Sequence, residues 1–269
     1  MTGDLVNREI DALAALVWAR KQERDLLLLL DYDGTLVEIA PRPESAVPSP
    51  ELLNLLARLS ARPDMAVAVV SGRPLSDLLT LLPIPGLNYL GSHGGEGLIQ
   101  GRPWRPRGLA YNPDELEKLK SQATEALKGV GGWWLEDKPL GFALHYRQAS
   151  ASQEAALMAV LTPWLDQVAR QGRFQVLPGK KVVELLPDGV SKGAAIQEIT
   201  VSPGFIESFP VYLGDDFTDE GVFQMLAGKG LTVKVGRSDS GTAAAYWLAR
   251  PAAVRQFLAR LARHREDRR

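Results

Sequence analysis

Five consecutive leucines, Leu26 to Leu30, form a short apolar run that ends directly in polar residues. A wholly apolar run of this length, bounded by turn residues, is typical of a strand covered by helices on both faces of a parallel sheet. Similar runs alternate with stretches whose leucines recur at the spacing of one helical face. The elements predicted in this part are strands at 26–30, 66–70 and 87–90 and helices at 2–23, 52–59 and 74–82. This alternation predicts an α/β fold with a parallel sheet.

The pattern changes near residue 104, where strands and helices no longer alternate one by one. The predicted order becomes helix, hairpin, helix, hairpin, which is typical of an antiparallel α+β unit. The elements are helices at 113–128 and 152–170, strands at 133–138 and 140–147, and strands at 174–177 and 181–186. We therefore expect an inserted second domain over 104–186 and a core domain formed by 1–103 together with 187–269.

The α/β pattern resumes after the insert. Ser191 can cap a helix that begins at Lys192, and Thr218 is predicted to cap a later one. The remaining predicted elements are strands at 211–213, 231–235 and 245–248 and a last helix from Pro251. The basic residues 264–269 are interpreted as a solvated helix end rather than a binding patch.

Composition limits the classes of protein to consider. With 269 residues, 45% hydrophobic residues and a net charge of -1, the chain can form an ordinary core and has no general affinity for nucleic acid or membranes. The absence of cysteine excludes disulfides, thiolate catalysis and cysteine-ligated metals. No secretory signal or bilayer-spanning run is evident. We expect a soluble cytoplasmic protein; the oligomeric state stays open, with a monomer slightly favoured.

The polar residues after the leucine run offer chemistry suited to phosphate transfer. Asp31 and Asp33 lie two residues apart, followed by Gly34. One carboxylate can attack phosphorus and form an aspartyl-phosphate, while the other protonates the leaving alkoxide and then deprotonates water. An Asp-x-Asp pair alone is equally compatible with an ordinary turn. The neighbouring strand and helix ends therefore decide between these interpretations.

Two further clusters lie at such ends. Ser71, Gly72 and Arg73 separate a strand from a helix, where a hydroxyl and backbone N–H groups suit a phosphate oxygen. Lys192 opens a helix, where a cation is unfavourable unless bound phosphate or the Asp31 carboxylate compensates it. An ordinary turn and a solvated surface lysine are the alternatives.

A fourth cluster is strongly acidic. Asp215, Asp216, Asp219 and Glu220 follow an apolar strand within a few residues. Such carboxylates repel one another unless a cation neutralises them, and Mg²⁺ prefers oxygen ligands of this kind. The pattern favours metal binding by Asp215 and Asp216, whereas Asp219 and Glu220 also fit the start of a helix.

Taken in order, the four clusters resemble the four motifs of haloacid dehalogenase (HAD) phosphatases. They are Asp31-x-Asp33, Ser71-Gly72-Arg73, Lys192 and Gly214-Asp215-Asp216-x-x-Asp219. The resemblance implies a Rossmann-like core with an inserted α+β cap. It implies Asp31 as nucleophile, Asp33 as acid and base, and Ser71 and Lys192 as the residues that hold the phosphoryl group. Arg73 is expected among the substrate-binding residues. It also implies Mg²⁺ bound by Asp31, the Asp33 carbonyl and Asp215, completed by Asp216 or Asp219.

The substrate must be recognised by the insert and the loops. Glu136 and Lys138 alternate onto one face of an insert strand, and Glu184 lies on the last insert strand. Carboxylates and an ammonium group could bind sugar hydroxyls, although an uncovered polar sheet face explains the pattern equally well. Residues 91–96, which include His93, Gly94 and Glu96, form a further polar and flexible group.

These details resemble the trehalose-6-phosphate phosphatase family within the HAD superfamily. The matching positions are Gly91-x-His93-Gly94-x-Glu96, Glu136-x-Lys138, His145-Tyr146-Arg147 and Glu184. The resemblance implies a Mg²⁺-dependent hydrolase of trehalose 6-phosphate, with Glu136, Lys138 and Glu184 on the distal glucose. His93, Gly94 and Glu96 would lie near the substrate at the domain junction.

Three alternatives remain open. A phosphatase of the same superfamily could act on sucrose-6-phosphate or mannosyl-3-phosphoglycerate. A phosphomutase would share the aspartyl-phosphate but exclude water from it. A catalytically inactive binding domain on the same fold is the third alternative, although every candidate catalytic position is filled.

Overall fold

The structure is a computed structural model that describes residues 2–21, 23–40, 42–237 and 241–263. The chain divides into two compact units. The core unit comprises the described residues of Met1–Arg105 and Ser191–Arg269, and the insert unit comprises Pro106–Val190. The predicted basic end at 264–269 lies outside the described residues.

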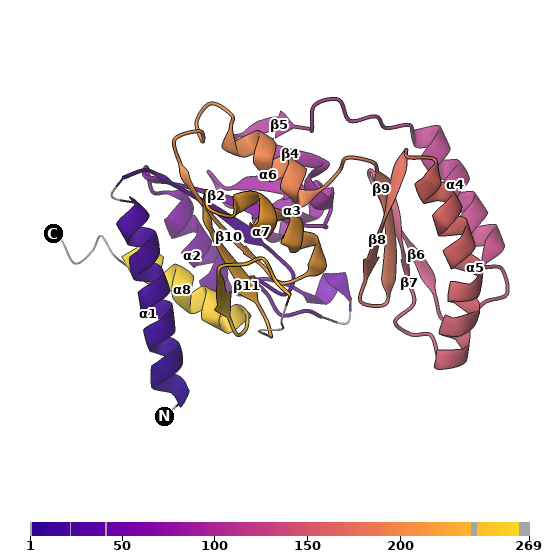
Figure 1. Ribbon diagram of the computed structural model, residues 1–269, viewed down its shortest axis with the longest axis horizontal. Helices are drawn as coiled ribbons and strands as arrows, with labels where there is room; N and C mark the ends of the chain where they lie inside the picture. Colours follow the sequence, from indigo (N-terminus) through magenta and orange to yellow (C-terminus); the bar gives the residue numbers. More distant parts are fainter. Residues whose placement is uncertain (1, 22, 41, 238–240, 264–269) are drawn as a thin grey trace. The chain divides into compact units, whose positions relative to one another are not determined.

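The core unit is built on an eight-stranded sheet with the order β12-β11-β10-β1-β2-β3-β4-β5 (Figure 1). Its strands are β1 (Leu26–Asp31), β2 (Met65–Val70), β3 (Asn88–Gly91), β4 (Glu96–Ile99), β5 (Arg102–Trp104), β10 (Phe209–Gly214), β11 (Leu231–Val235) and β12 (Tyr246–Leu248). From β12 to β3 all neighbours are parallel, which confirms the predicted α/β fold. At the other edge β4 and β5 are antiparallel. The sequence pattern misses these two strands because they are short and lie in a glycine-rich stretch with weak strand propensity.

Helices cover both faces of this sheet. They are α1 (Thr2–Lys21), α2 (Pro50–Ser60), α3 (Leu75–Leu81), α6 (Lys192–Thr200), α7 (Glu220–Leu226) and α8 (Pro251–Arg263), with short 3-10 helices η1 (Pro43–Ser45), η2 (Ser92–Gly94) and η3 (Phe217–Asp219). Residues of α1, α2, α3 and α8 share one hydrophobic core, and residues of α6 and α7 share another.

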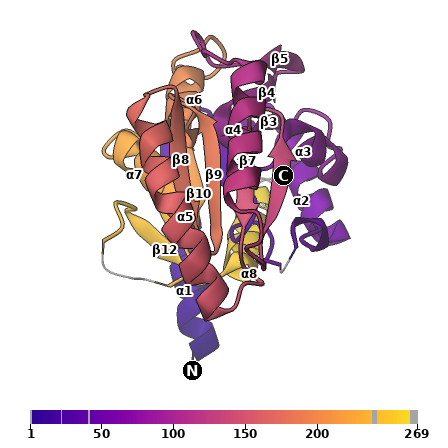
Figure 2. The same cartoon turned by 90° about the vertical axis from the view of Figure 1, so that its right-hand side faces the viewer.

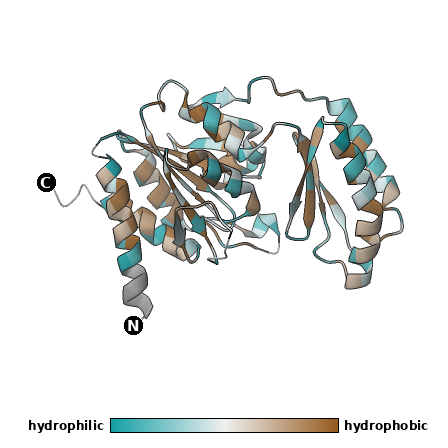
Figure 3. Ribbon diagram, viewed as in Figure 1, coloured by the Kyte–Doolittle hydropathy of each residue, from teal (hydrophilic) through white to brown (hydrophobic). Residues whose placement is uncertain are grey.

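The leucine run of β1 is apolar throughout because its side chains pack alternately into the two cores on opposite faces of the sheet. Leu26, Leu28 and Leu30 belong to the core under α1, α2 and α8, whereas Leu27 and Leu29 pack with α6 and α7. Each leucine is at most 1% exposed. Burial of a leucine side chain contributes roughly 1.5–3 kcal/mol, so β1 is a strong anchor in the middle of the sheet. Figure 3 shows the hydrophobic colouring of the central strands.

The start of α7 differs from the sequence prediction. Thr218 lies inside η3 and does not cap α7, which begins at Glu220. Instead, the Asp216 carboxylate accepts a hydrogen bond from the Asp219 N–H, and the Asp219 carboxylate accepts one from the Asp216 N–H. Charged acceptors bind the N–H groups at a helix start more strongly than a hydroxyl does. The prediction of Thr218 as the cap is therefore wrong.

The insert unit is an antiparallel sheet covered on one face by two helices that lie side by side (Figure 2). The helices are α4 (Pro113–Ala126) and α5 (Ala151–Arg170), and the strands, in the spatial order β6-β7-β9-β8, are β6 (Trp134–Lys138), β7 (Gly141–His145), β9 (Val182–Pro187) and β8 (Phe174–Gly179). Alternate strand residues such as Phe142, Leu144 and Leu185 form its core with the helices. The residues between them point to the opposite face. None of the helices in the described part of the chain is long and apolar enough to cross a bilayer.

Candidate active site

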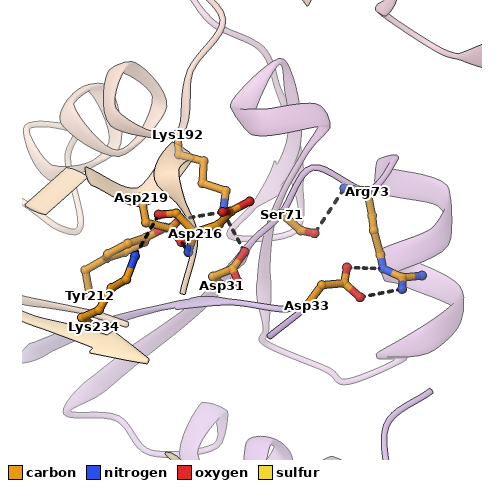
Figure 4. A network of polar contacts seen from close by, with 9 residues as sticks. All are labelled: Asp31, Asp33, Ser71, Arg73, Lys192, Tyr212, Asp216, Asp219 and Lys234. Atoms are coloured by element: carbon orange, nitrogen blue, oxygen red, sulfur yellow. Dashed lines mark hydrogen bonds and ion pairs between the residues drawn. The ribbon is translucent and has the colours of Figure 1, made fainter. Parts of the chain in front are cut away.

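The predicted catalytic residues of the core unit lie together at the carboxyl ends of the parallel strands (Figure 4). Asp31 is the last residue of β1, Ser71 follows β2, and Asp215 follows β10. Because β10 and β2 flank β1 in parallel register, these three ends are adjacent. Ligands of such sheets bind beyond the carboxyl ends of the strands.

Lys192 at the start of α6 pairs with two buried carboxylates. Its Nζ lies 2.7 Å from Asp31 Oδ1 and 2.7 Å from Asp219 Oδ1. Burial lowers the pKa of Lys192, but the charges of Asp219 and Asp31 outweigh this effect and raise that pKa above its usual range. The predicted compensation of this cation by Asp31 is therefore present, and Asp219 adds to it.

Asp31 has an environment that resists its negative charge. Burial raises the pKa of its carboxyl well above the usual value, and the charges of Asp219 and Asp215 raise it further against the opposing effect of Lys192. Burial and the carboxylates of Asp219 and Asp215 thus oppose the ionisation of Asp31, and Lys192 only partly offsets them. A positively charged ligand at this position would favour the ionised Asp31.

Three carboxylates form a group with room for such a cation. Oxygens of Asp31, Asp215 and Asp219 lie within 4.8 Å of one another. Gly34, with φ of +81°, permits this approach, because a Cβ at that position would lie 2.1 Å from Asp215 Oδ2. Oxygen donors suit Mg²⁺, so the carboxylates of Asp31 and Asp215, with Asp219 next to them, fit the predicted metal. The carboxylate of Asp216 caps η3 instead of joining the group.

Tyr212, on β10, belongs to this network although the sequence pattern did not identify it. Its hydroxyl donates a hydrogen bond of 2.6 Å to Asp219 Oδ1, and the Asp216 N–H donates one of 2.9 Å to Asp219 Oδ2. Asp219 thus accepts from Lys192, Tyr212 and Asp216, which fixes its position. In the sequence, a tyrosine in an apolar strand is interpreted as a core residue. Only the fold brings the Tyr212 hydroxyl to the Asp219 carboxylate.

Asp33 and Arg73 form a second ion pair beside Asp31. Arg73 Nε lies 2.7 Å from Asp33 Oδ2, and Arg73 Nη2 lies 2.8 Å from Asp33 Oδ1. Nη2 also donates to the Pro43 carbonyl at 2.8 Å, and the Arg73 N–H donates to Ser71 Oγ at 3.2 Å. This two-point pairing is geometrically specific and places Asp33 firmly at the strand end.

The predicted residues of the turn after β3 lie beside Ser71 rather than elsewhere in the core. The His93 N–H donates a hydrogen bond of 2.9 Å to the Ser71 carbonyl. Gly94 packs against the start of α6, and Glu96 begins β4. Glu96 Oε1 accepts hydrogen bonds from Ser92 Oγ and from the Leu75 N–H.

The predicted sugar-binding residues of the insert unit share the sheet face that α4 and α5 leave uncovered. Glu136 and Glu184 both lie in register with Ala143 between them. Lys138 Nζ lies 2.9 Å from Glu184 Oε2. The structure therefore brings Glu136, Lys138 and Glu184 together on one face.

An aromatic pair extends this polar face. His145 Nε2 lies 2.7 Å from Glu136 Oε2, and the His145 ring stacks on Trp134 with centroids 4.1 Å apart. Although burial raises the pKa of Glu136, the hydrogen bond with His145 and the charge of Lys138 hold it below the usual value. Glu136 is therefore an ionised acceptor at neutral pH.

Several known proteins resemble this chain in sequence or in fold. A bifunctional trehalose-6-phosphate synthase/phosphatase from Thermoproteus tenax is 40% identical over 216 residues, which cover 78% of this chain and 28% of that protein. The C-terminal domain of Candida albicans trehalose-6-phosphate phosphatase has a TM-score of 0.82 at 25% identity, covering 93% of this chain and 96% of that one. A HAD-like hydrolase from Bacteroides thetaiotaomicron shares the fold, with a TM-score of 0.63, 16% identity, and coverage of 88% of this chain and 100% of that one.

The curated relatives are longer than the matched region. The chain spans 28% of the Thermoproteus protein and 61% of the trehalose-phosphate phosphatase of Mycobacterium ulcerans, to which it is 32% identical over 87% of its own length. The profile of the Trehalose-phosphatase family matches residues 29–251, which include both the carboxylate site and the insert unit. The chain belongs to the trehalose-phosphatase family.

Proposed function

We propose that this chain is a Mg²⁺-dependent phosphatase that hydrolyses trehalose 6-phosphate to trehalose and phosphate. The observation that carries the proposal is the pairing of Lys192 with Asp31 at 2.7 Å inside a group of three carboxylates. This arrangement supplies a nucleophile, a cation for phosphoryl oxygens and a metal site at one strand end. Phosphoryl transfer requires this combination of positioning and charge neutralisation.

The chemistry proceeds in two steps on Asp31. A carboxylate oxygen of Asp31 attacks phosphorus as the bond from phosphorus to the sugar oxygen breaks, giving an aspartyl-phosphate and the free sugar. Water then attacks the phosphorus, the bond to Asp31 breaks, and phosphate leaves with the carboxylate restored. Lys192 and Ser71 hold the phosphoryl oxygens during both steps.

Asp33 moves the proton in both steps. It protonates the departing sugar oxygen in the first step and accepts a proton from water in the second. Because Arg73 binds both oxygens of Asp33, Asp33 must exchange at least one of these bonds for the substrate oxygen. We infer that Arg73 holds Asp33 near the strand end until substrate replaces that contact.

Asp31 and Asp215, with the Asp33 carbonyl, are the groups that we assign to Mg²⁺. Asp219 is already occupied by Lys192, Tyr212 and the Asp216 N–H, so its main role is to hold Lys192. When bound, Mg²⁺ neutralises the charge of the carboxylates and of the phosphate, and it stabilises the negative charge that develops in transfer.

The polar face of the insert unit is the part that we assign to the sugar. Glu136 and Glu184 are acceptors and Lys138 is a donor, which matches the mixed requirements of sugar hydroxyls. These residues are assigned to the distal glucose. A direct test is the release of phosphate from trehalose 6-phosphate, sucrose 6-phosphate, hexose 6-phosphates and p-nitrophenyl phosphate, each with Mg²⁺. The largest kcat/KM is expected for trehalose 6-phosphate; preference for another sugar phosphate would overturn the assigned substrate.

Glu184→Ala should raise KM for trehalose 6-phosphate by roughly tenfold or more, because a hydrogen bond to a charged group is worth about 1.5–3 kcal/mol. Turnover of p-nitrophenyl phosphate, which has no glucose, should change less than about twofold by the same reasoning. Steady-state kinetics on both substrates make this measurement.

Asp137→Ala is the matched control for Glu184→Ala. Asp137 lies on β6 of the same sheet, its side chain is 70% exposed, and it pairs with Lys120 of α4 on the opposite face. The Asp137→Ala variant should leave the kinetics with trehalose 6-phosphate and with p-nitrophenyl phosphate unchanged. Equal losses of Glu184→Ala on the two substrates would argue against a sugar-binding role for this face.

A further inference from the structure

A left-handed turn over residues 91–96 connects β3 with β4 in the core unit. Ser92, His93 and Gly94 follow one another with φ of 49°, 55° and 90°. Residues other than glycine rarely adopt this backbone conformation, because it is strained. Such strain persists only where the surrounding structure imposes it. The contacts of the turn therefore indicate which parts of the structure impose this strained conformation.

One set of contacts joins the turn to the loop after β2, which carries Ser71. The Ser92 N–H donates to the Arg73 carbonyl at 2.7 Å, and the His93 N–H donates to the Ser71 carbonyl at 2.9 Å. The His93 ring lies directly over Gly72, since a Cβ on Gly72 would be 2.5 Å from His93 Nε2. The loop that is assigned to phosphate is thus shaped by the backbone and ring of this turn.

A second set of contacts closes the turn. Glu96 Oε1 accepts hydrogen bonds of 2.8 Å from Ser92 Oγ and 3.0 Å from the Leu75 N–H. Glu96 therefore ties the strained residues to the first residue of α3, just beyond Arg73. Both bonds end on one oxygen atom, and an amide oxygen has the lone pairs to accept both of them.

A third set of contacts reaches α6, which carries Lys192. A Cβ on Gly94 would lie 2.5 Å from the Ala195 Cβ and 3.0 Å from the Ser191 carbonyl oxygen. The backbone of the turn thus packs directly against the first turn of α6. The same six residues touch both elements that are assigned to the phosphoryl group.

We propose that the left-handed turn sets the spacing between the Ser71 loop and Lys192, and so shapes the phosphate pocket. In this proposal His93, Gly94 and Glu96 are positioning residues that do not touch the substrate. The family resemblance had instead implied that they bind the substrate near the domain junction. The inference rests on the proposed phosphatase function. It predicts that damage to the turn weakens every phosphate ligand to the same degree.

Gly94→Ala tests the contact with α6, and Gly101→Ala is its control. Gly101 also has a left-handed φ, of 72°, but a Cβ there would meet no atom within 4 Å. Both variants carry the same backbone penalty. We expect Gly94→Ala to lower kcat/KM about tenfold or more for both trehalose 6-phosphate and p-nitrophenyl phosphate, and Gly101→Ala to change it less than about twofold. The Ki of inorganic phosphate should rise with the first variant alone, and adding Ala195→Gly to Gly94→Ala should recover part of the loss.

Glu96→Ala and Glu96→Gln keep the test decisive if Gly94→Ala fails to fold. The alanine variant should lose activity equally on both substrates, and glutamine should restore most of it. Losses confined to trehalose 6-phosphate would overturn the proposal and assign these residues to the sugar. A glutamine variant as impaired as alanine would also overturn it, because the two hydrogen bonds on Oε1 would then not explain the role of Glu96. If the parent protein cleaves only p-nitrophenyl phosphate, the assigned substrate fails, while the aryl phosphate and inorganic phosphate measurements still test the turn.

Discussion

Asp31→Asn is expected to lower phosphate release by about 10⁴-fold or more on every substrate, with Mg²⁺ at saturation. An amide oxygen is a weak nucleophile and cannot form the aspartyl-phosphate that divides the reaction into two steps. The change keeps the size of the side chain at the buried end of β1. Phosphate release by the purified variant, measured over hours with trehalose 6-phosphate, gives the result. Turnover near that of the parent protein would exclude Asp31 as the nucleophile.

The same variant should not lose stability in Mg²⁺-free buffer. Asp31, Asp215 and Asp219 have oxygens within 4.8 Å of one another, and asparagine removes one of the three repelling charges. Lys192 keeps its contact with Asp219. Thermal melting with EDTA should therefore give a Tm equal to or above that of the parent protein. Added Mg²⁺ should raise the Tm of the parent more than that of the variant. A variant that melts far below the parent would contradict this electrostatic account.

The central part of the fold could be predicted because local pattern and tertiary environment agree there. Leu26 to Leu30 are all apolar since each side chain faces one of two cores, and only a strand covered on both sides allows this. The position of Asp31 follows from the end of that strand. Lys192 at a helix start indicated a missing anion, and the fold supplies Asp31 and Asp219.

The remainder depends on pairings that no local pattern contains. Strands β4 and β5 exist because β4 pairs with β3 and β5 pairs with β4 at the edge of the sheet. Tyr212 reads as a core residue, and its role arises only because β10 ends beside Asp219. Glu96 reads as a polar residue in a flexible loop, yet its carboxylate joins Ser92 to Leu75 across a turn and a helix start. Such contacts between distant segments separate a residue that binds substrate from one that holds the site in place.

Lys192→Met should damage both activity and folding. The lysine is 4% exposed and lies between Asp31 and Asp219, which are 4% and 0% exposed. Removing one partner of a buried ion pair costs about 3–5 kcal/mol because the remaining charges are left uncompensated. Loss of a fixed cation beside the phosphoryl group should lower kcat by about 10³-fold. Urea unfolding at pH 7 and single-substrate kinetics measure the two effects.

A second substitution separates these two effects. Asp219→Asn in the Lys192→Met background removes one of the two carboxylates that lost their cation. Much of the lost stability should therefore return. Activity should not return, since the phosphoryl group still lacks its cation and Asp31 still lacks its partner at Oδ1. The Asp219→Asn single variant, with Lys192 still paired to Asp31, is the matched control and should retain more activity than the double variant. A double variant that recovers turnover along with stability would mean that Lys192 serves only to neutralise Asp219. It would then have no direct part in phosphoryl transfer.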